Sequence, residues 1–327
     1  MKKENNTSFL SNVVMLMLSQ IVIKILGFVY RIVMMQVEGF GDIGKGFYNA
    51  GFQIYIILLT ISSVGIPTVL SKLVAERASK GDYQAAHRIF KISLILFAGI
   101  GAAISASLFI WAEQVATIVL NIPEVKYVLM ALAPSIVFVA ISSVLRGYFA
   151  GLGSMKAASI SRTLEQFFKC VLTITLVYSF IGNDPAIMAA GANFATTLAI
   201  IISFSYLVIF YQRRRKTIKE NIKTSEVSEK KEKTGTLIKT ILLISIPITL
   251  GSLVAIVNEM IDTVTVSRGV QSFYYHLFDS AEVLQEEAMR LTRNIIQNRG
   301  GYAYATSVGD SFLYGACAGN IIFNSKK

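Results

Sequence analysis

Long apolar runs dominate this chain and decide what it can fold into. Seven of them cover residues Phe9–Val37, Phe47–Val74, Ile89–Trp111, Tyr127–Val144, Ile160–Ile181, Ile187–Phe210 and Leu237–Val266. Each approaches or exceeds the about 20 residues that a helix needs to cross a bilayer core of about 30 Å. The backbone must satisfy its own hydrogen bonds in lipid, and the short alternating segments of a transmembrane barrel are absent. With 54% hydrophobic and only 16% charged residues, the sequence predicts an all-α, polytopic membrane helix bundle rather than a soluble domain.

The positive charges predict the orientation of this bundle. The formal net charge is +11, and Lys and Arg gather before the first run and in every second loop after it, most densely in residues 212–236. The intervening loops are nearly free of charge, so the positive-inside rule places the N-terminus and the basic loops in the cytoplasm of a bacterial-type plasma membrane. These clusters suit contact with anionic lipids, and nucleic acid is not expected as a partner. The first run is too long for a signal peptide and is interpreted as a retained helix.

Changes in composition predict four regions along the chain. Residues 1–211 form an N-terminal six-helix lobe, and the mixed Lys and Glu segment 212–236 forms a cytoplasmic linker. Residues 237–290 begin a second lobe with the seventh membrane helix. Residues 291–327 lack periodicity, and a one-nucleotide shift in their codons can encode apolar, helix-like strings. We interpret this region as a frameshifted, irregular tail on a C-terminally truncated chain, with a natural soluble terminus as the alternative.

A polar stripe on the first run is the strongest candidate for a binding site. Gln20, Lys24, Gly27 and Arg31 follow one another at spacings of four, three and four, which places them on one helix face. A charge at the bilayer centre costs about 2.5–3.5 kcal/mol on insertion scales, so Lys24 is expected to face protein or a water-filled cavity. Cations in such a cavity would bind an anion such as a phosphate group. In the alternative interpretation, Arg31 snorkels to the interface and Lys24 pairs with a neighbouring helix.

The seventh run carries a candidate cation site. Asn258, Glu259 and Asp262 lie within little more than one helical turn, and Asn258 and Asp262 share a face. Two acids and an amide could bind sodium or a proton, although acids are also easily tolerated near the end of a membrane helix. Pro247 is expected to bend this helix, and bent helices are often functional in transporters.

Other polar residues favour structural roles. Arg162, Glu165 and Lys169 are spaced for ion pairs within one helix and are interpreted as a structural cluster near the cytoplasmic side. His87 and His276 are isolated, without the spacing of metal ligands and without a nucleophile nearby. The sequence therefore indicates no enzyme, no cofactor and no metal site.

Three stretches carry a resemblance to a known family. Residues 51–76 read GFQIYIILLTISSVGIPTVLSKLVAE, residues 146–166 read RGYFAGLGSMKAASISRTLEQ, and residues 261–271 read IDTVTVSRGVQ. Together they resemble polysaccharide flippases similar to stage V sporulation protein B, in the superfamily of lipid II flippases and MATE exporters. The resemblance implies two lobes of helices that move lipid-linked saccharides by alternating access. It also implies that Lys24 stands where lipid II flippases tend to place a cavity-facing cation, and that Asp262 matches an acidic position that binds sodium in some relatives.

The sequence thus predicts a flippase for a lipid-linked polysaccharide or peptidoglycan precursor. Its expected partners are that substrate, membrane lipids and a coupling sodium ion or proton, and the substrate-binding candidates are Lys24, Arg31 and Gln20. Two alternatives stay open. One is a MATE-like drug or cation antiporter, which the cationic stripe disfavours, and the other is a non-transporting scaffold of a cell-wall complex. The chain could also be inactive if the second lobe is incomplete.

Overall fold

Helices make up all the regular structure in the described part of the chain, which confirms the predicted all-α bundle. A computed structural model describes residues 2–37, 40–120, 122–225 and 233–274. In chain order the elements are α1 (Lys2–Met35), α2 (Gly41–Ser63), α3 (Ile66–Ser79), α4 (Tyr83–Ile110), α5 (Ala112–Gln114), a π turn (Val115–Val119), a 3₁₀ turn (Pro123–Val125), α6 (Lys126–Gly151), α7 (Lys156–Ser179), α8 (Pro185–Lys223) and α9 (Thr234–Tyr274). The tail 291–327 lies outside the described residues, so its interpretation stays a prediction.

Six stretches of the described residues are long and apolar enough to cross a membrane. They are Met17–Met34, Gly44–Ser79, Tyr83–Ile110, Pro123–Gly151, Pro185–Lys223 and Thr234–Asn258. Each matches one of the seven predicted runs. The remaining run, Ile160–Ile181, does form helix α7, but every long window of that helix contains Arg162, Glu165 and Lys169. These three charges, interpreted from the sequence as a structural cluster, are why α7 is not among the six, and its role as a membrane span stays a prediction.

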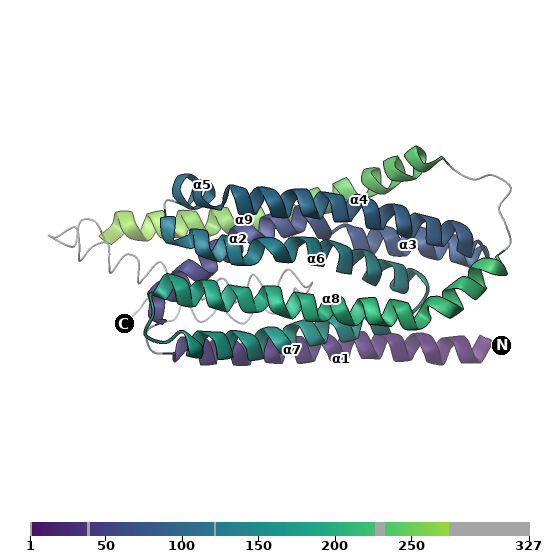
Figure 1. Ribbon diagram of the computed structural model, residues 1–327, viewed down its shortest axis with the longest axis horizontal. Coiled ribbons are helices and arrows are strands. Elements are labelled where there is room, and N and C mark those ends of the chain that lie inside the picture. Colours follow the sequence, from purple (N-terminus) through teal and green to yellow (C-terminus); the bar gives the residue numbers. More distant parts are fainter. Residues whose placement is uncertain (1, 38–39, 121, 226–232, 275–327) are drawn as a thin grey trace. The chain divides into compact units, whose positions relative to one another are not determined.

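Within residues 1–254, which form one compact unit, the helices run side by side with their long axes aligned (Figure 1). Helix α8 packs against α6 and α7, α6 also packs against α3 and α4, and α1 packs mainly against α7. The first core cluster includes Phe40, Leu129 and Met188, and the second includes Leu70, Phe90 and Leu207.

The second predicted run is broken into α2 and α3. Helix α2 ends at Ser63, and α3 begins at Ile66 with Pro67 in its first turn. Proline has no N–H to donate to the preceding turn, so the helical ladder is interrupted there. The hydroxyls of Ser62 and Ser63 both donate to the carbonyl of Leu59, at 3.0 and 2.6 Å. The polar groups at the break are thus partly satisfied from within α2.

Two glycines let α6 approach α3 closely. A Cβ added to Gly147 would lie 2.9 Å from the Cα of Pro67, and one added to Gly151 would lie 2.7 Å from the Cβ of Val74. Their spacing of four places both glycines on one face of α6. This is the small-residue packing that membrane helices use in place of a hydrophobic driving force.

Neighbouring hydroxyls bond to the backbone around the proline inside α6. Ser105 of α4 donates to the carbonyl of Ala133 at 2.7 Å, and Thr197 of α8 donates to the carbonyl of Ala131 at 2.6 Å. Pro134 lies between these helices in α6. Such side-chain donors allow a proline to be tolerated in a membrane helix.

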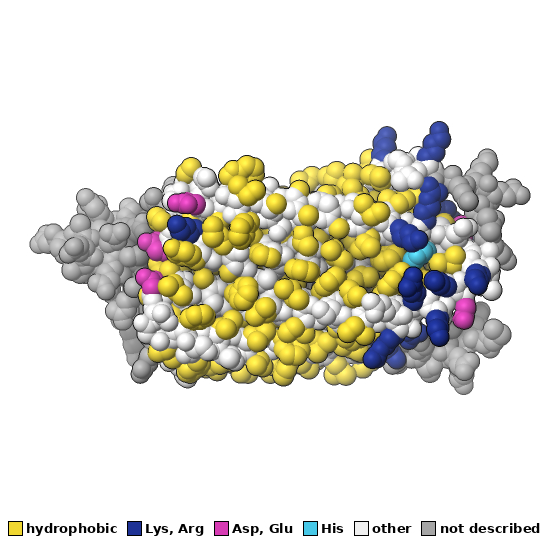
Figure 2. All heavy atoms as spheres, viewed as in Figure 1, with side chains coloured by type: hydrophobic (Ala, Val, Ile, Leu, Met, Phe, Trp, Pro, Cys, Tyr) yellow, Lys and Arg dark blue, Asp and Glu magenta, His cyan; other side chains and the backbone are white. Residues whose placement is uncertain are grey.

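Lys and Arg side chains gather at one end of the bundle. Figure 2 shows this cluster on one face, and Figure 1 places the N-terminus, the α3–α4 turn, the α6–α7 turn and the end of α8 at the same end. Helix α8 continues past Phe210 to Lys223, so the first part of the predicted linker is helical. The basic loops, which alternate with nearly uncharged loops along the sequence, therefore lie together at one end of the bundle.

Two side-chain contacts attach the region around the linker to α4. Ser225 accepts a hydrogen bond from the N–H of Gln84 at 3.3 Å and donates to the carbonyl of Gly81 at 3.1 Å. Arg88 donates to the hydroxyl of Thr234, at the start of α9, at 2.9 Å. Both ends of the linker region are therefore attached at the start of α4.

Candidate functional site

Helices α1 and α7 pack side by side and run in the same direction. We call their contact the α1–α7 seam, and several polar residues of interest lie on these two helices. A Cβ added to Gly27 on α1 would lie 3.5 Å from the amide nitrogen of Gln166 on α7. Three residues further along both helices, the Lys169 ammonium lies 5.9 Å from the centroid of the Tyr30 ring. Equal steps on the two helices show that they run in the same direction and in register.

Lys169 is a buried cation near the middle of α7. Only 6% of its surface is exposed, and its ammonium also lies 4.5 Å from the centre of the Phe52 ring on α2. The negative face of an aromatic ring attracts a cation, by about 2 kcal/mol when the pair is desolvated. An ionisable residue inside a membrane helix is costly and usually marks a pathway for a substrate or an ion. Lys169 is therefore a functional candidate.

A second buried cation, Arg146 of α6, joins three helices. Its guanidinium donates to Glu165 of α7 at 2.6 Å, to the hydroxyl of Ser161 at 2.9 Å, and to the hydroxyl of Ser203 on α8 at 3.1 Å. Ser203 in turn donates to the carbonyl of Ser161 at 2.9 Å. Arg146 is 8% exposed, so this network replaces the water that the charge would otherwise need. With these hydrogen-bond partners, Arg146 suits a structural role that holds α6, α7 and α8 together.

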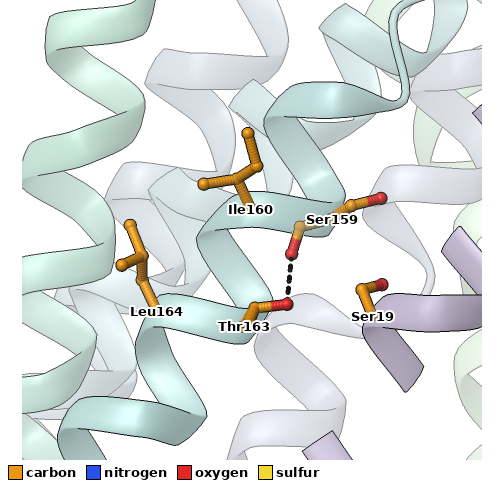
Figure 3. Close-up of a pocket in the computed structure, with 5 residues that line it drawn as sticks. All are labelled: Ser19, Ser159, Ile160, Thr163 and Leu164. Atoms are coloured by element: carbon orange, nitrogen blue, oxygen red, sulfur yellow. Dashed lines mark hydrogen bonds between the residues drawn. The ribbon is translucent and has the colours of Figure 1, made fainter. Parts of the chain in front are cut away.

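A small cavity opens on the seam beside Ser19. It has a volume of about 160 Å³ and is lined by Ser19, Ser159, Ile160, Thr163 and Leu164. Figure 3 shows Ser19 on α1 and the other four residues on two successive turns of α7. Thr163 donates to the carbonyl of Ser159 at 3.1 Å, whereas the hydroxyl of Ser159 has no hydrogen-bond partner among the described residues. The cavity is thus mainly apolar, with a few hydroxyls.

One residue of the predicted stripe on α1, Gly27, is shown to lie on this seam. Gln20 is half-buried, Gly27 faces α7, and Lys24 is exposed. The side chain of Arg31 lies outside the described residues. The structure brings Lys24 and Lys169 onto adjacent helices, and the role of Gln20, Lys24 and Arg31 in binding stays a prediction.

The predicted cation site lies in the second compact unit, residues 255–327, and only part of it is described. Asn258 is exposed on α9. The side chains of Glu259 and Asp262 lie outside the described residues. Across the part of the chain that the structure describes, no group of three or more His, Cys, Asp or Glu residues could hold a metal ion.

The sequence interpretation missed the arrangement of Arg146, Glu165 and Lys169. It expected Glu165 to pair within α7, with Arg162 or Lys169, whereas its ion pair in the described structure is with Arg146. It also ended the fourth apolar run at Val144, two residues before Arg146. The available signal was the position of Arg146 within a continuous apolar helix pattern, where a charge needs a partner.

Comparison with known proteins identifies a family and relatives. The profile of the family described as polysaccharide biosynthesis protein matches residues 9–276. Stage V sporulation protein B of Bacillus subtilis (strain 168) is 32% identical over 213 residues, covering 65% of this chain and 40% of that protein. The lipid II flippase MurJ of the same organism is 28% identical over 216 residues, covering 63% of this chain and 39% of that protein. The chain thus spans about two fifths of the length of these relatives.

Solved structures share the fold. An outward-facing multidrug resistance MATE family transporter of the MOP superfamily superposes with a TM-score of 0.62 at 17% sequence identity. The match covers 80% of this chain and 55% of that protein. At this identity the likeness establishes the helix arrangement and not the substrate.

Proposed function

The chain belongs to the family of polysaccharide biosynthesis proteins, and from that premise we propose that it acts in moving a lipid-linked polysaccharide or peptidoglycan precursor across the plasma membrane. Such substrates join an anionic phosphate or pyrophosphate to a polar saccharide and a long lipid. The headgroup must cross the bilayer core while the lipid stays in it. No covalent reaction is required, so the function is transport and not catalysis.

One observation supports this proposal most directly, the cations along the α1–α7 seam. Lys169 is buried in mid-helix against Phe52, and Lys24 lies on the adjacent helix. Positive charge at such depth is costly and usually marks the path of a substrate or an ion. A phosphate-bearing headgroup is an anion that such cations suit. In this proposal Lys24 contacts the headgroup, Gln20 hydrogen bonds to it, and Arg31 extends the same stripe.

The shared fold leaves a MATE-like antiporter as a second candidate. Its substrates would be organic cations, which two lysines along the seam disfavour. A coupling sodium ion or proton at Asn258, Glu259 and Asp262 is compatible with either candidate. A non-transporting scaffold would require neither the cations nor the coupling site.

A transport assay with Lys24 variants tests the proposal. The full chain is reconstituted in proteoliposomes, and the flipping of fluorescent lipid II is compared with the uptake of an organic cation. We expect Lys24→Ala to slow flipping at least tenfold and Lys24→Arg to retain most of it. Lys126→Ala is the control, because Lys126 pairs with Glu113 at 3.8 Å outside the seam. Uptake of organic cations without lipid II flipping, or unchanged flipping by Lys24→Ala, would reject the assignment.

The proposed orientation puts the basic end of the bundle in the cytoplasm. A cysteine introduced at Lys91, an exposed residue at the start of α4, should not react with an impermeant maleimide added to intact cells. A cysteine introduced at Glu113, which is exposed in α5 beyond the opposite end of α4, should react. The reverse pattern would overturn the orientation.

A further inference from the structure

The cavity on the α1–α7 seam has the chemistry of a site for a lipid chain. Its volume is about 160 Å³, and Ile160 and Leu164 provide apolar walls. Its polar groups are three hydroxyls, from Ser19, Ser159 and Thr163. A saccharide would need many more hydrogen-bond partners than these, whereas an apolar chain needs none. The cavity therefore suits a run of methylene groups close to a polar linkage.

The hydroxyl of Ser159 lies behind the lining of this cavity. Its residue is 1% exposed, and the hydroxyl oxygen itself is fully buried. A ligand in the cavity therefore meets mainly apolar surface, which again favours an apolar chain over a saccharide.

Positive charge lies at the end of this cavity nearest the basic side of the bundle. Lys156 is exposed and precedes Ser159 and Ile160 by three and four residues, so it lies one turn before the cavity on the same face of α7. Lys156 forms no ion pair with any other described residue. It is also the first residue of α7, whose start has no side-chain cap, so free N–H groups add positive potential.

We propose that this crevice, defined by Ser19, Ser159, Ile160, Thr163 and Leu164 with Lys156 at its mouth, binds an anionic phospholipid. The phosphate lies against Lys156 and the start of α7. The first part of one acyl chain lies between α1 and α7, against Ile160 and Leu164. A lipid whose head lies at the membrane surface and whose chain runs inward fits this order of cation and apolar wall. The inference goes beyond the proposed function, because such a lipid would bind whether or not it is transported.

Native mass spectrometry of the full chain tests the site. The protein is released from micelles that contain equal amounts of phosphatidylglycerol and phosphatidylcholine, and the retained lipids are counted. We expect phosphatidylglycerol to be retained in excess, and Lys156→Gln to weaken its apparent affinity about fivefold, as expected for about 1 kcal/mol per lysine near an anionic headgroup. Ile160→Trp fills the crevice and should remove the excess retention. Lys91→Gln is the matched control, an exposed lysine near the basic end of α4, and should change nothing.

Several results would overturn the proposal. Equal retention of the two lipids by the wild-type chain would do so, as would unchanged retention in both Lys156→Gln and Ile160→Trp. Preferred retention of a polyprenyl phosphate over phosphatidylglycerol, in a second mixture of these two lipids, would assign the crevice to the lipid carrier instead. Thermal unfolding of each variant in the same micelles shows whether it is folded. If Ile160→Trp is not folded, Lys156→Gln alone decides.

Discussion

Neutralising Glu165 should reveal how much the joint of α6, α7 and α8 depends on one ion pair. Glu165→Gln keeps the size of the side chain and removes the charge that faces Arg146 at 2.6 Å. Arg146 stays 8% exposed and keeps its bonds to Ser161 and Ser203. Loss of a partner for a fully buried charge costs about 3–5 kcal/mol. The Glu165 side chain is 30% exposed, so water compensates in part, and we expect a loss of about 1.5–3 kcal/mol, the range for a hydrogen bond to a charged group.

Unfolding of the full chain in mixed micelles of increasing dodecyl sulfate content, followed by circular dichroism, measures this loss. The expected change is about 10- to 150-fold in the unfolding equilibrium constant. The double variant Arg146→Met with Glu165→Met should be more stable than Glu165→Gln, since it leaves no charge unpaired in the joint. The matched control is Glu76→Gln, which removes an exposed pair with Lys80 at 3.0 Å and should change stability by less than about 0.5 kcal/mol. A Glu165→Gln variant as stable as this control, or a double variant no more stable than Glu165→Gln, would refute the reasoning.

Two further changes test packing in the same unfolding assay. Gly151→Ala should destabilise by about 1–3 kcal/mol, because its Cβ would lie 2.7 Å from α3, whereas Gly99→Ala meets nothing within 4 Å and should be neutral or stabilising; equal effects would contradict the close packing of α3 and α6. Phe52→Leu removes the ring beside Lys169 and should cost about 0.5–2 kcal/mol more in the wild-type chain than in a Lys169→Met background, a difference that vanishes if the cation–π contact contributes nothing.

The helices themselves were predictable from the sequence, because apolar length in a membrane protein leaves little alternative to a helix. The break between α2 and α3 was not predicted, although Pro67 marks it. A hydropathy pattern averages over a single proline, and residues 44–79 remain apolar across the break. The predicted run Ile160–Ile181 also forms a helix, α7, which packs against α1 and α8 although it carries three charges.

The candidate site was only partly predictable. Helical spacing predicted one face for Gln20, Lys24 and Gly27, and of these Gly27 is shown to face a neighbour. Which helix that neighbour would be depends on how α7 folds back after α6, and spacing within one helix carries no such information. The same fold-back brings Arg146 to Glu165, 19 residues away, and this contact replaces the pairs that α7 could have formed within itself. Lys169 lies against the rings of Tyr30 and Phe52.

The attachment of Ser225 and Thr234 to the start of α4 has a mechanical consequence. If α9 made no side-chain contact with α4 near its beginning, it could move without disturbing α4. Here Ser225 hydrogen bonds to Gly81 and Gln84, and Thr234 hydrogen bonds to Arg88, so both residues are fixed to the first turns of α4. A pull on the beginning of α9 is therefore delivered to the first turns of α4, so these two helix starts should shift together.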